Sequence, residues 1–242
     1  MKLKLLAGHV AKLAPKLKNF MSAATLSLGV AAFGLSAAGA DEAPAAAPAT
    51  AEQAKAAPQG ETPGDAQSGQ GKTGTCVACH GLDGNSSNPE WPSLAGQSAE
   101  YIQKQLQAFK TGARQNVLMT PMAMPLSEQD MWDLGAFYAT QTLKGLEADP
   151  SKVNAGQRLY RSGDPARHIT ACAACHGPAG HGNPAAKYPA IHGQHATYLA
   201  AQLRSYRDGK RGTDPNQMMR NIAAALSDDQ IDAVASYIQG LR

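Results

Sequence analysis

The sequence lacks the charge pattern of a nucleic-acid-binding protein. Its formal net charge of +3 comes from the first 40 residues, which hold five Lys and no Asp or Glu. Without them the chain has 17 basic and 19 acidic side chains, a net charge of −2. A nucleic-acid-binding domain is expected to carry a basic patch. We therefore expect no nucleic acid among the partners.

The sequence also lacks stretches that alternate between apolar and polar residues, so it does not predict a β-sheet. Apolar residues instead recur at near-helical spacing within residues 101–109 and 198–206. Two further apolar faces, in residues 134–138 and 231–238, each follow a Ser and early acidic residues that are typical of a helix start. The pattern predicts an all-α fold.

The part of the chain after residue 64 contains two copies of one pattern. Residues 91–114 (WPSLAGQSAEYIQKQLQAFKTGAR) align with residues 188–211 (YPAIHGQHATYLAAQLRSYRDGKR). Residues 119–141 align in the same way with residues 219–241. The offset changes from 97 to 100 residues, as loop insertions would produce. The sequence therefore predicts two tandem modules, residues 65–146 and 147–242, which meet near the turn signal Asp149-Pro150.

The N-terminal 64 residues have a different character. Residues 1–40 combine a basic start, a weakly apolar run and the small-x-small sequence Ala38-Gly39-Ala40, which is typical of a cleaved signal peptide. An uncleaved membrane anchor is the alternative interpretation. Residues 41–64 are rich in Ala and Pro without apolar periodicity, which predicts a disordered linker. We expect the rest of the chain to be exported from the cytoplasm.

Aromatic residues are scarce, at 5% of the chain, and each predicted module holds few large apolar side chains. Modules of this size do not easily support a core of their own. We therefore expect an apolar group other than a side chain to fill the middle of each module.

Cysteine is equally scarce, and its positions indicate what that group is. The four cysteines form two Cys-x-x-Cys pairs, each followed at once by His: Cys76, Cys79 and His80, and Cys172, Cys175 and His176. A shared zinc site would need the two distant pairs to meet, and a thioredoxin-like pair needs a strand and helix context. Disulfides would leave the adjacent His unexplained. Cys-x-x-Cys-His is the attachment signal of c-type haem, with the His as proximal iron ligand. The sequence thus predicts two covalently bound haem c groups.

The region from about Ser68 to Arg242 resembles the dihaem cytochrome c4 family. The resemblance rests on CVACHG at 76–81 with GLDGNSS after it, PSLAGQ at 92–97, IHGQHATYLAAQL at 191–203 and NIAAALSDDQIDAVASYIQGLR at the C-terminus. It implies two fused class I cytochrome c domains, each wrapped around one haem. It also implies a periplasmic electron carrier, often loosely associated with the membrane, between donors such as quinol–cytochrome c reductase and a haem-copper terminal oxidase. The long N-terminal linker departs from the usual short leader.

Met119 is predicted to be the sixth ligand of the iron in the first module, and Met219 that of the iron in the second module. Among the eight Met, only these two occupy equivalent positions, each seven residues before the Leu of the Leu-Ser motif at 126 and 226. Resemblance to the family selects the same residues, and a Met/His pair is typical of electron-transfer haems. Packing against the core is the alternative role of a Met.

Pro92 and Pro189 are candidates to offer backbone carbonyls to the proximal His rings, because a ligating His normally donates its second ring N–H to a fixed acceptor. Both prolines open the Pro-x-(Leu/Ile)-x-Gly stretch found in cytochromes of this type. The His residues without an equivalent in the first module are expected at the surface or in loops: His168, His181, His192 and His195.

Two irons with both axial positions filled predict an electron-transfer protein rather than an enzyme. Two alternatives remain open. One is the dihaem electron-accepting subunit of a periplasmic dehydrogenase, such as flavocytochrome sulfide dehydrogenase. The other is a haem enzyme with one open iron. Four basic residues in the second module fit either a docking patch or an ordinary solvated helix face: Arg204, Arg207, Lys210 and Arg211.

Overall fold

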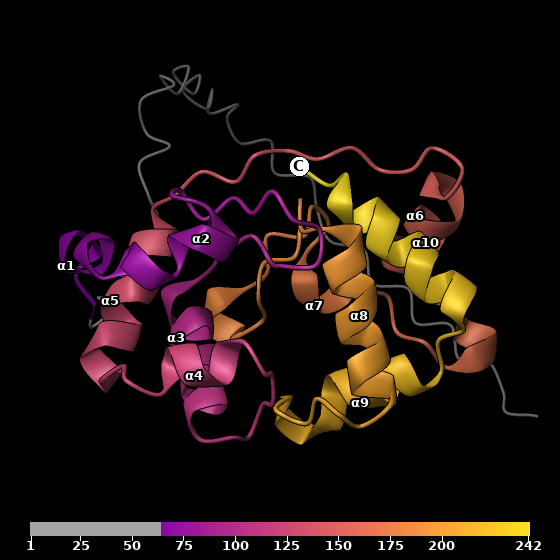
Figure 1. The fold of residues 1–242 in the computed structure, drawn as a ribbon. Helices are drawn as coiled ribbons and strands as arrows, with labels where there is room; N and C mark the ends of the chain where they lie inside the picture. The colour runs from indigo at the N-terminus through magenta and orange to yellow at the C-terminus, as the bar shows by residue number, and fades with distance from the viewer. Residues whose placement is uncertain (1–63) are drawn as a thin grey trace, which may run out of the picture. The chain divides into compact units, whose positions relative to one another are not determined.

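The computed structural model describes residues 64–242, and the proposed signal peptide and most of the linker lie outside this range. The described part is helical, with two isolated β-bridges, Asp164 with Ile169 and Asn183 with Tyr188, as its only β pairing. The all-α prediction is therefore confirmed. We refer to the part up to α5 as domain 1 and to the part from α6 onward as domain 2. Figure 1 shows them as two sets of helices.

Domain 1 contains five α-helices and one short 3-10 helix. In chain order they are α1 (Ala66–Gly71), η1 (Thr73–Thr75), α2 (Val77–His80), α3 (Ala99–Lys110), α4 (Met119–Ala123) and α5 (Glu128–Ala139). Domain 2 repeats this order and has three 3-10 helices instead of one. Its elements are α6 (Val153–Ser162), η2 (Pro165–Arg167), α7 (Ala173–His176), η3 (Pro184–Ala186), α8 (Ala196–Arg207), η4 (Pro215–Gln217), α9 (Met218–Ala224) and α10 (Asp228–Gln239).

The last helix of each domain begins with a capping box. The Ser127 hydroxyl accepts a hydrogen bond from the backbone N–H of Asp130, whose side chain in turn accepts from the N–H of Ser127. Ser227 and Gln230 make the same reciprocal pair at α10. These bonds satisfy backbone N–H groups that have no partner within the helix, which is why both helices begin where the sequence predicts.

Each last helix crosses the first helix of its domain at a glycine. A Cβ on Gly69 of α1 would come within 2.0 Å of the Asp133 carbonyl oxygen on α5. A Cβ on Gly156 of α6 would come within 2.2 Å of the Ala233 carbonyl oxygen on α10. The sequence analysis did not predict the first helices α1 and α6, although Leu159 and Tyr160 of α6 are buried on the same face as Gly156. Their position depends on this close backbone approach.

The apolar core of each domain is small and includes a cysteine of the haem motif. In domain 1 the buried cluster consists of Ile102, Leu134, Phe137 and Tyr138, with Cys76 packed against it. The cluster of domain 2 is larger, and Cys172 packs against it. The side chains that would bind haem therefore lie at the edge of the core, as expected if the cofactor completes it.

Replacing Gly69 with Ala should destabilise the holoprotein by about 1–3 kcal/mol, because the added methyl group would force α1 away from α5. Gly71 of the same helix is the matched control, since a Cβ there meets no atom within 4 Å. Guanidinium unfolding of the two variants checks this. Equal stability of Gly69→Ala and Gly71→Ala would contradict the proposed close packing.

A second prediction concerns the ionic contacts that hold α1 to α5. The Lys72 ammonium lies 2.5 Å from Asp133 Oδ2 and, together with the N–H groups of Asp65 and Gln129, lowers the pKa of Asp133. A depressed carboxyl pKa contributes stability that is present above the ordinary value near 3.8 and is lost as the pH falls below it. Asp133→Asn should therefore lower the unfolding free energy at pH 7 and change it much less at pH 3. Glu90→Gln, at an exposed carboxyl, should have little effect at either pH.

Candidate functional site

Each Cys-x-x-Cys-His motif forms a single helical turn. Helix α2 begins directly after Cys76 and ends at His80, so Cys76, Cys79 and His80 stand at positions i, i+3 and i+4 on one face. The turn ends there because Gly81 has φ +80°, which a residue with a Cβ rarely adopts. Helix α7 repeats the arrangement. None of the four cysteines forms a disulfide, and all four are partly buried. Two thiols and one imidazole on one face fit a porphyrin held by two thioethers and one axial nitrogen.

The imidazole of each motif is fixed by one hydrogen bond to a proline carbonyl. His80 Nδ1 lies 2.8 Å from the Pro92 oxygen, and His176 Nδ1 lies 2.9 Å from the Pro189 oxygen. Because a carbonyl only accepts, Nδ1 carries the proton, and the lone pair is left on Nε2. The rings are 7% and 8% exposed, and this burial lowers the pKa of both His. A neutral, oriented imidazole is the form that binds a metal.

Buried hydroxyl and thiol groups lie together beside each motif. Burial raises the pKa of the Cys76 thiol and raises the pKa of Cys172 to about 11. The Tyr160 hydroxyl donates to the Gly177 carbonyl at 2.6 Å, whereas the buried Tyr138 hydroxyl lies beside the Cys76 thiol and has no oxygen or nitrogen partner among the described residues. A buried hydroxyl without an oxygen or nitrogen partner at the attachment site fits a group that binds there.

The two candidate methionines lie at the start of equivalent helices. Met119 is the first residue of α4, and its N–H donates to Asn116 Oδ1. Met219 is the second residue of α9, and both side chains are partly buried. Met122 and Met124 in the same segment of domain 1 are 44% and 55% exposed. Met131 is fully buried in α5, as expected for a packing residue.

The sequence reasoning missed the glutamines that join the domains. Gln194 Oε1 accepts from the N–H of Ser93, and its Nε2 donates to the Ser93 carbonyl, both at 2.9 Å. Gln97 makes the same pair of bonds with Ala190, at 3.1 and 2.8 Å. The repeat alignment contained the signal, because Gln97 and Gln194 end the equivalent motifs AGQ and HGQ.

Two buried arginines form a second pseudo-symmetric contact. Arg114 donates to Gln105, Tyr198 and Gln202, and Arg211 donates to Gln202, Tyr101 and Gln105. They are 8% and 4% exposed, and neither is paired with a carboxylate among the described residues. The Nε of Arg211 is buried without a partner. Uncompensated buried charge is costly, so these arginines are compatible with a cofactor that brings carboxylates of its own.

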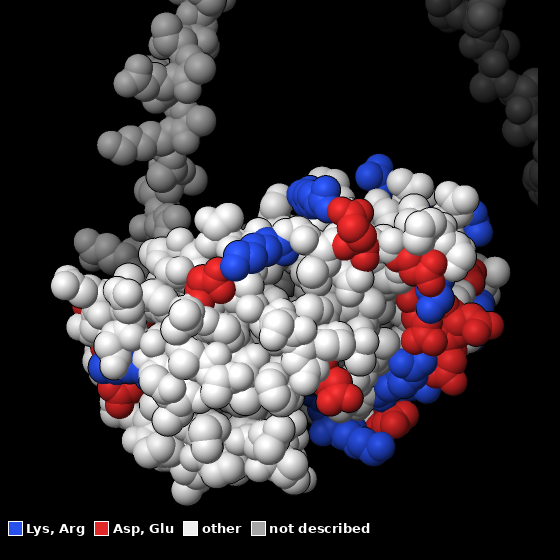
Figure 2. Space-filling model, turned by 45° about the horizontal axis from the view of Figure 1, so that its top comes forward, with Lys and Arg blue, Asp and Glu red and all other residues white. Residues whose placement is uncertain are grey.

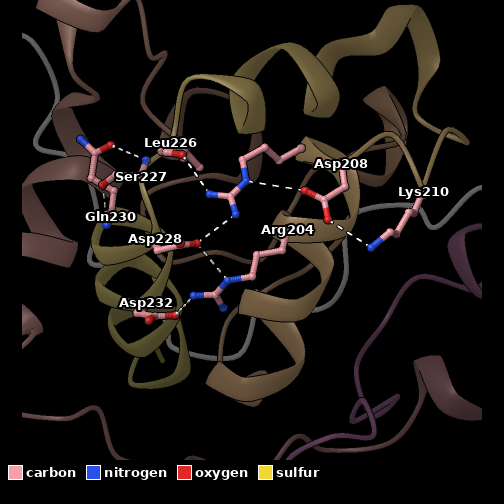
Figure 3. Close-up of polar contacts among 9 residues, drawn as sticks. Arg204, Asp208, Lys210, Leu226, Ser227, Asp228, Gln230 and Asp232 are labelled. Carbon is pink, nitrogen blue, oxygen red and sulfur yellow. Dashed lines mark hydrogen bonds and ion pairs between the residues drawn. The ribbon is translucent and has the colours of Figure 1, made fainter.

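The basic cluster of the second module is therefore not one surface. Arg211 is buried at the domain interface, and Figure 3 shows Arg204 of α8 between Asp228 and Asp232 of α10. Arg207 also pairs with Asp228, at 2.9 Å. On the face in Figure 2, Lys and Arg over domain 2 are interspersed with Asp and Glu. The pairing of Arg204 and Arg207 with acidic residues of α10 argues against a basic docking patch, and the burial of Arg211 fits neither a docking patch nor a solvated helix face.

One of the four histidines lies in a loop, as predicted, but is buried there. His195 is 7% exposed, and its Nε2 lies 2.8 Å from the Ser86 carbonyl of domain 1. It is an interface residue because Ser86 belongs to domain 1. The Ser86 hydroxyl in turn donates to the carbonyl of Cys79 in the haem motif. His168 and His181 are exposed as predicted, and His192 is partly buried against the Gly180 carbonyl.

None of the helices within residues 64–242 is long and apolar enough to cross a membrane.

Comparison with known proteins identifies the fold and its relatives. The family model for cytochrome c matches twice, over residues 66–142 and 153–242. Cytochrome c4 of Thiocapsa roseopersicina is 52% identical over 180 residues, which cover 74% of this chain and 93% of that protein. The crystal structure of reduced recombinant cytochrome c4 from Pseudomonas stutzeri has a TM-score of 0.73 at 44% identity, covering 74% of this chain and 100% of that one. A thiosulfate dehydrogenase electron acceptor of Stutzerimonas stutzeri is 42% identical over 166 residues, which cover 67% of this chain and 76% of that protein.

Proposed function

Because the chain belongs to the cytochrome c4 family and is a dihaem electron-transfer protein with two covalent haem c groups, we propose that it carries single electrons in the periplasm. Its donors are respiratory, for example quinol–cytochrome c reductase, and its acceptor is a haem-copper terminal oxidase. Residues 1–40 serve as the export signal in this proposal, and peripheral association with the membrane brings the protein to its partners.

The proposal assigns the same four roles in each domain. In domain 1, Cys76 and Cys79 attach the haem, and His80 and Met119 are the axial ligands. In domain 2 the corresponding residues are Cys172, Cys175, His176 and Met219. The observation that carries this assignment is the fixed imidazole: both His donate Nδ1–H to a proline carbonyl and keep Nε2 free to bind iron.

A haem iron bound by His and Met exchanges one electron, and the Met raises its reduction potential. The residues of the chain would then keep each iron six-coordinate, so that no position is open to a substrate. Burial of the imidazoles among apolar side chains adds a second effect, because an apolar surrounding favours the less charged, reduced state. These properties suit an electron carrier and do not suit the alternative of an enzyme with an open iron.

Replacing Met119 with Ala should leave two haems attached per chain and lower the reduction potential of one of them, because only that iron loses its thioether ligand. The far-red sulfur-to-iron charge-transfer band of the oxidised protein should fall to half its strength. Met219→Ala should do the same for the other haem. Exposed Met122 provides the control, and Met122→Ala should change neither the band nor the potentials.

An unchanged band in Met119→Ala would show that another residue binds the iron of domain 1. A wild-type protein that is high-spin at one haem would favour the enzyme alternative.

A second candidate function is electron acceptance from a periplasmic dehydrogenase, as an associated subunit or acceptor. It is favoured by the similarity to the thiosulfate dehydrogenase electron acceptor of Stutzerimonas stutzeri. In addition, the structure titled thiosulfate dehydrogenase (TsdBA) from Marichromatium purpuratum has a TM-score of 0.65 at 33% identity, although this chain covers only 39% of it. A flavocytochrome sulfide dehydrogenase is another enzyme of this kind that could supply the electrons.

Either partner must approach a haem, and domain 1 offers an apolar surface for this. Exposed apolar side chains flank Met119 on both sides: Val117 at 90% exposure, Leu118, Met122 and Met124. Domain 2 has the polar Gln217 at the position of Val117 and small Ala224 at that of Met124. Weak electron-transfer complexes bury only a small interface, and a few exposed apolar side chains can supply it. Because only domain 1 of the two described domains has these side chains around its candidate Met ligand, we place the docking site of the partner there.

Val117→Asp should slow electron exchange with the physiological partner at least several-fold and leave reduction by ascorbate unchanged, because only the partner contacts this surface. Two stopped-flow assays separate the candidate functions. The first measures reduction of the protein by thiosulfate and thiosulfate dehydrogenase, and the second measures its oxidation by membranes that contain the terminal oxidase. Rapid exchange in the first assay alone would favour the acceptor role. Gln217→Asp is the matched control in domain 2, and an equal loss of rate in both variants would contradict docking on domain 1.

A further inference from the structure

The proline carbonyls that fix the proximal imidazoles belong to peptide units that are hydrogen-bonded on both sides. The Pro92 carbonyl and the Ser93 N–H are parts of one planar peptide group and point in opposite directions. The carbonyl accepts from His80 Nδ1, and the N–H donates to Gln194 Oε1 at 2.9 Å. In domain 2 the unit of Pro189 and Ala190 lies in the same way between His176 and Gln97.

In both cases the glutamine comes from the opposite domain. Gln194 of domain 2 holds the peptide that fixes His80 of domain 1, and Gln97 of domain 1 holds the peptide that fixes His176 of domain 2. Each glutamine also donates its Nε2 to the carbonyl of the residue that it contacts. The arrangement is reciprocal, with equivalent atoms on the two sides.

Each glutamine is itself held in place by its own domain. Gln97 Oε1 accepts from the N–H of Ser98, the N-cap of α3, and Gln194 Oε1 accepts from the N–H of His195, the N-cap of α8. The amides are therefore fixed to the ends of long helices, and Gln97 is buried. A fixed amide can orient a peptide unit across an interface, whereas a mobile surface side chain cannot.

We propose that Gln97 and Gln194 are positioning residues that act in trans, each tuning the haem of the other domain. This inference rests on the proposed function, in which His80 and His176 bind iron. A hydrogen bond to a peptide N–H polarises that peptide and makes its carbonyl a stronger acceptor. A stronger acceptor increases the electron density of the imidazole and its basicity as a ligand, which stabilises ferric iron. The domain interface thereby sets part of the reduction potential of both haems.

The test is potentiometric titration of the holoprotein with each potential assigned to a domain. Met119→His and Met219→His give the assignment, because loss of Met lowers the potential of the haem concerned. Gln194→Leu should raise the potential of the domain 1 haem and leave that of domain 2 unchanged. Gln97→Leu should raise only the potential of the domain 2 haem.

A substitution that strengthens the acceptor, instead of removing it, gives a second readout. Gln194→Glu keeps the acceptor for the Ser93 N–H and makes it stronger, so it should lower the potential of the domain 1 haem. Gln239→Leu is the matched control, since Gln239 also accepts from a backbone N–H, that of Ala196, and donates to a carbonyl, that of Glu147, but contacts neither proline peptide unit. This control should leave the assigned potentials in place.

The proposal would be overturned if a glutamine substitution shifted only the potential of the haem in its own domain. Equal shifts in Gln239→Leu and Gln194→Leu would also overturn it. The same sign of shift in Gln194→Leu and Gln194→Glu would also overturn it. Failure of the proposed function would be visible separately, in the wild-type protein. There, a haem that is not low-spin with His and Met ligands would contradict the proposed function before any glutamine is changed.

Discussion

The structure depends on one hydrogen bond in each domain, from the proximal imidazole to a proline carbonyl. This bond fixes the ring and its tautomer, and it directs Nε2 away from the backbone. The short helical turn of the Cys-x-x-Cys-His motif places two thiols on the same face as that ring. Because each apolar core is small, this face must be covered by the cofactor for the domain to be complete.

The interface between the domains is built from the same elements. The residue after each proline bonds a glutamine of the opposite domain, so the support of one imidazole is shared with the other half of the chain. The buried arginines Arg114 and Arg211 add two positive charges to this interface without a carboxylate partner among the described residues. In our proposal the two domains are therefore not independent carriers joined by a linker, because a change at Gln97 or Gln194 reaches the imidazole of the other domain.

Much of this arrangement could be predicted from the sequence, because its signals are local. The haem motifs, the capped last helices and the repeat are short patterns, and the repeat alignment pairs Met119 with Met219. Burial of His195 and Arg211 at the interface was not predicted, since one residue was read as a loop histidine and the other as part of a basic helix face. Their burial depends on contacts between residues about 110 positions apart, such as Arg211 with Tyr101. Helix α1 was missed because it is short and buries only Gly69, so it leaves no apolar period. Helix α6 does have an apolar face, with Leu159 and Tyr160 beside Gly156, and this signal was overlooked.

The central claim is that each domain holds one haem between a fixed histidine and a methionine. The most direct measurement is a count of covalent haems per chain in wild-type protein from the periplasm of a host with haem-attachment machinery. It is combined with the intensity of the far-red sulfur-to-iron charge-transfer band of the oxidised form. Our account predicts two haems and a band of full two-site strength. A single haem, or two haems with half the band, would contradict it.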